Sequence, residues 1–336
     1  MARSALRIFY LFLAMGLTFI AIFLWGYAQF VRPGPLAKQV TAIIPPGSGL
    51  DAISRTLEQA QIIADPLVFS IGARLSRAAT DLKAGEYLFP SAISPRQIIE
   101  LLKSGKTVVR RLTIVEGLTN AQVVNQLRAT DGLTGDIGIL PREGGLLPQT
   151  YYFSYGDSRR AIIKRMRDAM QKSLSDLWAK RAKGLPLKTL EEALVLASIV
   201  EKETGVAGER PRVAQVFLNR LEKGMRLQSD PTVVYAVTGG TGPLKRSLSA
   251  TDLKIASPYN TYVSGGLPPQ AICNPGLASI IATLNPVKTD ALYFVADGAG
   301  GHAFARTLSE HNRNVAAWRK LRKLRRDQAR KTPVIP

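Results

Sequence analysis

The hydrophobic positions of the chain begin with one long uncharged segment. Residues 8–28 contain no charged side chain over 21 positions. As a helix, this segment would span roughly 30 Å, the hydrocarbon thickness of a bilayer. Trp25 and Tyr27 lie near its end, and aromatic rings favour the membrane interface. We therefore expect a single-pass membrane anchor followed by a folded body.

A cleavable signal peptide is the alternative interpretation of this segment. Its apolar region would be only about 7–15 residues long, and residues 26–28, Gly-Tyr-Ala, are a poor cleavage site. Two basic residues precede the segment and two follow it closely, so charge alone does not fix its orientation. The short N-terminal tail favours a cytoplasmic tip, with the main body on the periplasmic or extracytoplasmic side of the cytoplasmic (inner) membrane.

A small α/β region is expected between residues 38 and 107. Val40–Ile44 and Gly85–Phe89 have the composition of strands. Three helices are predicted: one around Ile53, Leu57 and Ile62–Ile63, one over Pro66–Leu75, and one from Ser94 and Pro95 to Gly105. Helices packed on a two-stranded sheet resemble the LysM-like glycan-binding module.

The same order of strand, glycine turn and helix recurs at an offset of 70 residues. The matched positions are Ile44, Gly47, Ile53 and Leu57 in the first copy, and Ile114, Gly117, Val123 and Leu127 in the second. Four matches only suggest a repeat, because two similar units of strand, turn and helix can arise by chance.

Two further segments precede the middle of the chain. Residues 143–155 are rich in glycine and aromatic residues; we interpret them as a core strand, with a sugar-binding surface as the alternative. Residues 159–183 form a basic amphipathic pattern, which predicts a helix whose apolar stripe packs into the core.

The most apolar helix of the body is predicted over residues 189–205. Thr189 and Glu192 have the spacing of a capping box, which marks its start. No charged residue occurs from 193 to 200, so the helix is expected to be buried on all sides. Gly205 offers a stop signal. Beyond it, Pro211 and Gly224 delimit another helix, 232–237 is strand-like or helical, and 292–296 suits a strand.

Two acids, Glu201 and Glu203, stand at the end of this apolar helix. A carboxyl group there loses hydration, which raises its pKa and lets it act as a general acid near neutral pH. The alternative is that both are solvated, or paired with Lys202 or Arg210. Helix chemistry alone leaves both interpretations open.

Composition limits the classes of function. The net charge of +20 points to an anionic partner, and residues 319–331, with eight Lys or Arg and one Asp, carry +7 of it. Cys273 is the only cysteine, which excludes an intrachain disulfide. Two histidines without a cysteine cluster argue against zinc, and no metal or cofactor is expected. Neither a phosphate-binding loop nor a serine nucleophile elbow occurs.

Five ordered blocks resemble one known family. They read ASIVEKETGVAGERPRVAQVFLNRL, MRLQSDPTVVYA, SPYNTY, GLPPQAICNPG and LYFVADGAGGHAF. This order is similar to that of the MltG/YceG-like family of endolytic murein transglycosylases, over roughly residues 38–318. The resemblance implies an α+β fold with four parts: residues 1–31 as cytoplasmic tip and transmembrane helix, 38–107 as a LysM-like subdomain, 108–318 as a YceG-like catalytic domain (108–190 being a connecting part), and 319–336 as a basic tail.

The resemblance also implies an activity. Enzymes of this family cleave the MurNAc–GlcNAc β-1,4 bond of nascent peptidoglycan strands without water, leaving 1,6-anhydroMurNAc ends that terminate elongation. One glutamic acid protonates the glycosidic oxygen and then takes the proton of the C6 hydroxyl, whereas ordinary glycosidases use two carboxyl groups. The expected partners are glycan strands, with cell-wall synthases as candidate protein partners, and no nucleic acid.

The resemblance assigns roles to particular residues. In other lytic transglycosylases the catalytic Glu precedes a small hydroxyl residue near a helix end, as Glu203 precedes Thr204, so Glu203 is predicted to be catalytic and Glu201 structural. Candidate substrate-binding or positioning residues are Glu201, Gln228, Asp230, Asn260, Tyr262, Asn219 and Glu143. Asp230 could instead only shape a turn, and Asn219 could face solvent. The chain departs from the family at Gly145, where a bulkier residue is expected, and at Gln149, where an acid is expected.

Three alternative functions are distinguishable. A non-catalytic, membrane-anchored peptidoglycan-binding scaffold would keep the fold but lose the chemistry. A muramidase would use water, with Asp230 as a second carboxylate. A nucleic-acid binder would explain the charge, but the charge is concentrated in the tail and no nucleic-acid-binding motif is present.

Overall fold

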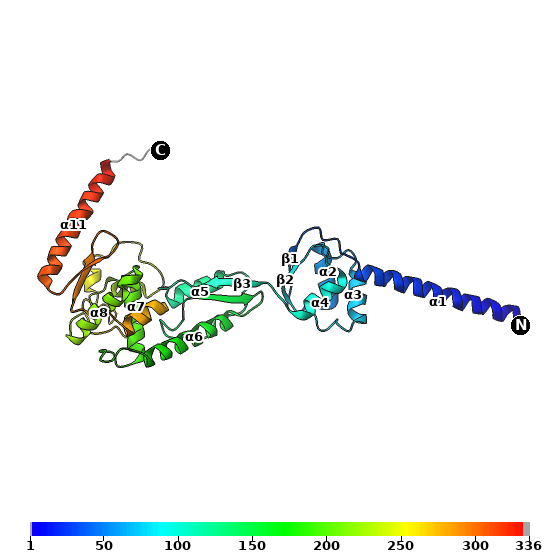
Figure 1. The fold of residues 1–336 in the computed structure, drawn as a ribbon, viewed down its shortest axis with the longest axis horizontal. Helices are drawn as coiled ribbons and strands as arrows, with labels where there is room; N and C mark the ends of the chain where they lie inside the picture. The colour runs from blue at the N-terminus through cyan, green and yellow to red at the C-terminus, as the bar shows by residue number, and fades with distance from the viewer. Residues whose placement is uncertain (1, 332–336) are drawn as a thin grey trace. The chain divides into compact units, whose positions relative to one another are not determined.

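The structure, a computed structural model, describes residues 2–331 of the chain (Figure 1). The chain divides into two compact units. Unit 1 comprises residues 1–111, 132–134 and 152–157, and unit 2 comprises 112–131, 135–151 and 158–336. Both contain helices and short strands, so the fold is of the mixed α+β kind predicted.

Unit 1 begins with one long apolar helix, α1 (Ala2–Val31). Its residues Leu6–Val31 are long and apolar enough to cross a membrane, with a mean hydropathy of 2.3, although a signal sequence has the same properties. The body of the unit then follows in the order β1 (Val40–Ile44), α2 (Leu50–Gln59), α3 (Pro66–Leu75), β2 (Gly85–Phe89) and α4 (Pro95–Ser104). β1 and β2 pair antiparallel, from Val40 opposite Phe89 to Ile44 opposite Gly85.

Two helices of unit 1, α3 and α4, begin where the sequence places a capping residue. Asp65 accepts hydrogen bonds from the backbone N–H groups of Leu67 and Val68 at the start of α3. Ser94 forms a complete capping box with Gln97 at the start of α4. α2 is shorter than predicted, because Gln61, just beyond its end, adopts a left-handed φ of 56°. The side chains of residues 62 and 63 are therefore buried beyond the helix and not on it.

The predicted repeat corresponds to a repeated local structure. β3 (Val109–Thr113) and α5 (Asn120–Ala129) follow each other as β1 and α2 do. Gly47 and Gly117, at the matched turns, both have φ of +78°, a conformation that glycine adopts at little cost. β3 pairs with β4 (Thr150–Ser154), the predicted aromatic strand. Tyr151 and Phe153 are buried and Tyr152 is exposed, so this segment contributes mainly to the core.

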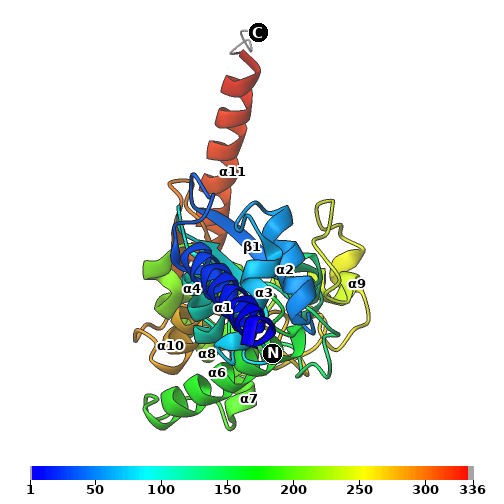
Figure 2. The ribbon, with the colours of Figure 1, turned by 90° about the vertical axis from the view of Figure 1, so that its right-hand side faces the viewer.

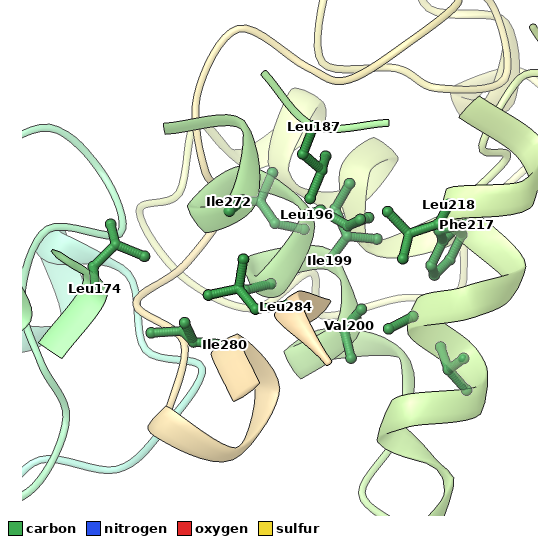
Figure 3. Packing of buried hydrophobic residues seen from close by; sticks show 14 of the residues in the cluster. Leu174, Leu187, Leu196, Ile199, Val200, Phe217, Leu218, Ile272, Ile280 and Leu284 are labelled. Atoms are coloured by element: carbon green, nitrogen blue, oxygen red, sulfur yellow. The ribbon is translucent and has the colours of Figure 1, made fainter. Parts of the chain in front are cut away.

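Unit 2 is built around α7 (Leu190–Glu203), which packs against four other helices. These are α6 (Arg159–Ala179), α8 (Arg210–Glu222), α9 (Asp230–Thr238) and α10 (Leu277–Leu284). Figure 3 shows the apolar core between them, in which Leu196, Ile199 and Val200 of α7 contact residues of α8 and α10. The segment predicted to be either strand or helix is thus the helix α9. Two single turns, Ala207–Glu209 and Asp252–Lys254, complete the helical part.

The ends of α7 differ from the prediction in detail. Thr189 accepts a hydrogen bond from the Glu192 backbone, but the Glu192 carboxylate accepts one from Lys188 instead of returning to Thr189. Only half of the capping box therefore forms. At the other end the chain leaves the helix through Thr204, which is extended, and Gly205 takes no left-handed conformation. Thr204, and not Gly205, ends the helix.

The C-terminal part of unit 2 is a hairpin followed by a long helix. β5 (Tyr293–Ala296) and β6 (His302–Ala305) pair antiparallel. α11 (Leu308–Lys331) starts against them and then extends away from the body of the unit (Figures 1 and 2). The predicted basic tail is continuous with this helix up to residue 331, and residues 332–336 lie outside the described residues.

Candidate active site

Glu203 is the last residue of α7, and its carboxylate meets the loop that precedes α9. The hydroxyl of Ser229 donates a short hydrogen bond to Glu203 Oε1. Ser229 is almost fully buried, whereas Glu203 retains partial exposure. Ser229 occupies the N-cap position of α9, but its side chain does not cap the helix. The hydroxyl that would normally satisfy the helix start is directed at the acid instead.

A second loop holds Ser229 in this position. The Ser229 backbone N–H donates to Thr261 Oγ1 at 3.0 Å, and Thr232 Oγ1 lies 2.8 Å from the same oxygen. The neighbouring Gln228 donates its backbone N–H to the carbonyl of Thr261 at 3.1 Å and adopts a left-handed φ of 50°. This conformation is strained for a residue with a Cβ, and such strain is concentrated at functional sites.

The environment of Glu203 brings its pKa close to neutrality. The pKa is raised from 4.5 to about 7, and burial is the largest cause of the rise. The charge of Asp230 raises it further, whereas the Ser229 hydrogen bond and the charges of His302 and Arg220 lower it. Because the carboxyl group is partly exposed, it can reach a substrate oxygen. Near neutral pH, both its protonated and its ionised forms are well populated.

Arg220 is a buried cation close to this acid. Its guanidinium donates to the carbonyls of Leu292 and Leu227, each at 2.7 Å. These bonds join α8 to the start of the β5 hairpin and to the loop that leads into Ser229. Arg220 thereby fixes the geometry of the loop while its charge favours the ionised form of Glu203.

Asp230 and Tyr262 lie beside Glu203 and contact each other. The Tyr262 hydroxyl donates to Asp230 Oδ1 at 2.6 Å. Burial, followed by this hydrogen bond, raises the pKa of Tyr262. Asp230 and Gln228 are exposed at the surface next to the acid. The structure thus brings these three predicted residues to the neighbourhood of Glu203.

Asn260 and Asn219 are buried, and their amide groups bind the protein's own backbone. Asn260 donates to the carbonyls of Leu253 and Ile255 and accepts from the N–H of Tyr262. Asn219 donates to the carbonyls of residues 289 and 291 at 2.8 and 2.9 Å. The alternative that Asn219 faces solvent is wrong. In this structure both amides brace the loops on which the exposed site residues stand.

Glu143 belongs to a different set of contacts. It accepts hydrogen bonds from the Asn120 backbone at 2.7 Å and from the Tyr235 hydroxyl at 3.4 Å. Burial raises its pKa. The neighbouring Gly145 has a clear steric reason to be glycine, because a Cβ there would lie 2.8 Å from Pro141 Cβ. The bulkier residue expected from the family would not fit this conformation.

Glu201 differs from Glu203 in every contact. Its Oε2 accepts from the backbone N–H of Gly276, the N-cap of α10, at 3.0 Å, and its Oε1 lies 3.8 Å from Arg210. A carboxylate is stabilised at a helix N-terminus by the orphan N–H groups and the helix dipole. Glu201 is therefore engaged in holding α7, α8 and α10 together.

Sequence reasoning missed several residues of the site: Ser229, Thr261, Arg220, and the pair formed by His302 and Glu209. His302 Nδ1 lies 2.6 Å from Glu209 Oε2, and the His302 charge lowers the pKa of Glu203. Ser229 had a local signal, since Ser before Asp-Pro is a typical helix start. Within residues 2–331, no cluster of three or more His, Cys, Asp or Glu side chains is arranged to hold a metal ion.

Comparisons with known proteins identify the family of the chain. The profile of the YceG-like family matches residues 42–317. A Streptococcus pneumoniae protein named endolytic murein transglycosylase is 35% identical over 83% of this chain, and the chain spans only 58% of that protein's length. A Bacillus subtilis protein of the same name is 32% identical, with 80% of this chain and 82% of that protein covered. The crystal structure of a yceG-like protein from Listeria monocytogenes is 34% identical, has a TM-score of 0.53, and matches 82% of this chain and 98% of that one.

Proposed function

The chain belongs to the YceG-like family, and we propose from this premise that it is an endolytic murein transglycosylase. Its relatives with that name share about a third of their residues with it over most of its length. The single observation that carries the proposal is the partly exposed Glu203, with a pKa of about 7 and a hydrogen bond from Ser229.

The proposed reaction uses Glu203 twice. The protonated carboxyl group donates its proton to the oxygen of the MurNAc–GlcNAc bond, the C1–O bond breaks, and GlcNAc leaves with a free 4-hydroxyl. The carboxylate then takes the proton from the C6 hydroxyl of the same MurNAc as O6 bonds to C1. The products are a 1,6-anhydroMurNAc end and a new GlcNAc end, Glu203 is protonated again, and no water is consumed.

A pKa near 7 suits both halves of this reaction. A strong acid would rarely hold the proton that the first step requires, and a very weak acid would give too little driving force for the proton transfer. Burial supplies the protonated form, while Ser229 and Arg220 stabilise the carboxylate that exists between the two steps. Burial and these two stabilising groups have opposing effects, and together they place one carboxyl group between the usual roles of acid and base.

The other residues bind or position. The exposed Gln228 and Asp230 and the half-buried Tyr262 are proposed to contact the sugars beside Glu203. Asn260 and Asn219 are proposed to hold their loops in place. Glu143 and Glu201 are proposed to act structurally.

The proposal extends to the anchor and to unit 1. The order β1–α2–α3–β2, with helices on a two-stranded sheet, supports a LysM-like glycan-binding role. α1 supports a single-pass anchor in the cytoplasmic membrane, with the body on the extracytoplasmic side. The substrate is then the glycan strand, and enzymes that synthesise the strand are the candidate partners.

Product analysis tests the function and the acid together. The full chain in detergent is incubated with purified sacculi, and the released fragments are identified by mass spectrometry. Wild type should give anhydro ends, and Glu203→Gln should reduce their rate by at least about 100-fold, because general acid–base catalysis is worth that much. Glu201→Gln is the matched control, two residues away on the same helix, and should remain active in its folded fraction.

Each contrary outcome has a definite meaning. Fragments with free reducing ends would establish a muramidase. A folded wild-type protein that binds sacculi without releasing fragments would establish a scaffold. Full activity in Glu203→Gln with loss in Glu201→Gln would move the catalytic role to Glu201.

A further inference from the structure

The exposed face of α3 is apolar. Leu67, Ile71 and Leu75 are 67%, 45% and 70% exposed, and their spacing of four residues places them in one stripe along the helix. The opposite face, with Phe69 and Ala73, is buried in the core of unit 1. A solvated helix normally presents polar residues on the face that this stripe occupies.

The two neighbouring helices of unit 1 show the usual pattern. α2 exposes Asp51, Arg55 and Glu58, and α4 exposes Arg96, Glu100 and Lys103. All three helices have the same length of ten residues and pack on the same core. The apolar stripe is therefore a property of α3 and not of the unit as a whole.

α3 also packs against the end of α1, as α4 does. The Phe30 ring of α1 lies directly on Gly72, where an added Cβ would be 2.2 Å from Phe30 Cε2. α3 lies on the side of unit 1 from which α1 emerges, and it runs across the direction of α1 (Figures 1 and 2). The exposed stripe therefore lies on a helix that packs against the end of the candidate span.

A cavity lies beside the same end of α1. It has a volume of about 370 Å³ and lies between the last turns of α1 and the start of α3, with Trp25, Arg32, Asp65 and Val68 in its lining. Trp and Arg at the end of a membrane span are typical of the headgroup region. The start of α3 is thus at the depth where lipid headgroups would surround α1.

We infer that α3 is an interfacial helix, whose stripe Leu67–Ile71–Leu75 contacts the lipids of the bilayer that α1 spans. This inference rests on the proposed anchoring role of α1 and is independent of the chemistry at Glu203. The stripe would enter the boundary between headgroups and acyl chains, as amphipathic helices of monotopic proteins do. Unit 1 would then be held against the membrane by two elements instead of one.

The test places a fluorescent probe on the stripe. Ile71→Cys in the full chain is labelled with an environment-sensitive dye; the native Cys273 is fully buried, which directs labelling to the new thiol. The protein is inserted, one copy per disc, into nanodiscs of phosphatidylethanolamine and phosphatidylglycerol, with or without lipids that carry a spin-label quencher near the headgroup. Glu100→Cys on α4 is the matched control.

Lipid contact predicts blue-shifted emission at residue 71 and at least about twofold quenching by the spin-labelled lipids, with neither effect at residue 100. A water-exposed spectrum at residue 71 would overturn the inference. So would a blue shift without quenching, because it would show contact with protein. Mass spectrometry of the sample shows whether α1 is retained. Cleavage of α1, as of a signal peptide, would also overturn the inference. Murein cleavage measured on the same sample reports separately on the proposed function.

Discussion

The hydroxyl of Ser229 donates to the carboxylate of Glu203 across 26 positions of sequence. The bond favours the ionised acid, whereas burial of the same group favours the protonated one. The pKa of about 7 is the balance of these two effects and the charges of Asp230, His302 and Arg220. Changes at either residue should therefore appear in the pH dependence of the reaction as well as in its rate.

Activity should fall as the pH rises through about 7. The first step needs protonated Glu203, so kcat/KM should be level at lower pH and decrease about tenfold per pH unit above the pKa. A single carboxyl group that acts twice gives one descending limb. A bell-shaped profile with an ascending carboxylate limb, measured by fragment release between pH 4 and 9, would indicate a second catalytic acid such as Asp230.

Ser229→Ala should move this descending limb to higher pH. The substitution removes a hydrogen bond to the ionised form, so the pKa of Glu203 should rise, and the protein should lose about 1 kcal/mol of stability. The control is Ser279→Ala on α10, since the buried Ser279 hydroxyl has no hydrogen-bond partner in the described part of the chain. If the descending limb of the pH profile does not move in Ser229→Ala, Ser229 does not influence the pKa of Glu203.

Glu203→Gln should stabilise the fold at high pH. The pKa is raised from 4.5 to about 7, so the stability that protonated Glu203 contributes is present below pH 4.5 and is lost as the pH rises through 7. A neutral amide escapes this loss, which amounts to at most about 3 kcal/mol. Urea unfolding at pH 5 and pH 8 should show the gain only at pH 8. Glu222→Gln, at the exposed end of α8, should show no such difference.

Gly144→Ala should destabilise unit 2. Gly144 has φ of +86°, and an added Cβ would lie 2.6 Å from the Cβ of Ala271. Left-handed strain and a clash with a buried neighbour together should cost about 2–4 kcal/mol. Gly265→Ala is the control, because its surroundings are open and its φ is ordinary. Equal denaturation midpoints for the two variants would contradict the predicted strain and clash at Gly144.

Helices with strong local signals could be predicted from the sequence, and their bounds with them. α3 and α4 start after Asp65 and Ser94, which cap them, and proline follows both residues. The buried α7 was predictable from its uncharged run. Residues 232–237 were ambiguous, because Val and Tyr suit strands as well as buried helices. The structure shows a helix, Asp230–Thr238, with Gly239 as its C-cap at φ of +60°.

Glu203 could be chosen from the sequence as the candidate acid, but the residues that surround it could not. Arg220 reads as an ordinary charged residue of an amphipathic helix, and only the tertiary fold buries it beneath two backbone carbonyls. Ser229 and Thr261 belong to polar loops, where sequence carries no information on which distant side chain they will meet. Asn260 was predicted to bind or position the substrate, and the structure places it fully buried within its own loop.

α7 has a further consequence through its length. It holds 14 residues between the cap at Thr189 and the C-cap at Thr204, and it is apolar on nearly every side. Its apolar side chains can therefore be exchanged for others of similar volume, but the number of residues in the helix cannot change. Deletion of one residue would rotate the carboxyl group of Glu203 by about 100° and withdraw it by about 1.5 Å, away from Ser229. The helix is a spacer of fixed length, in which an insertion or deletion is more damaging than most substitutions.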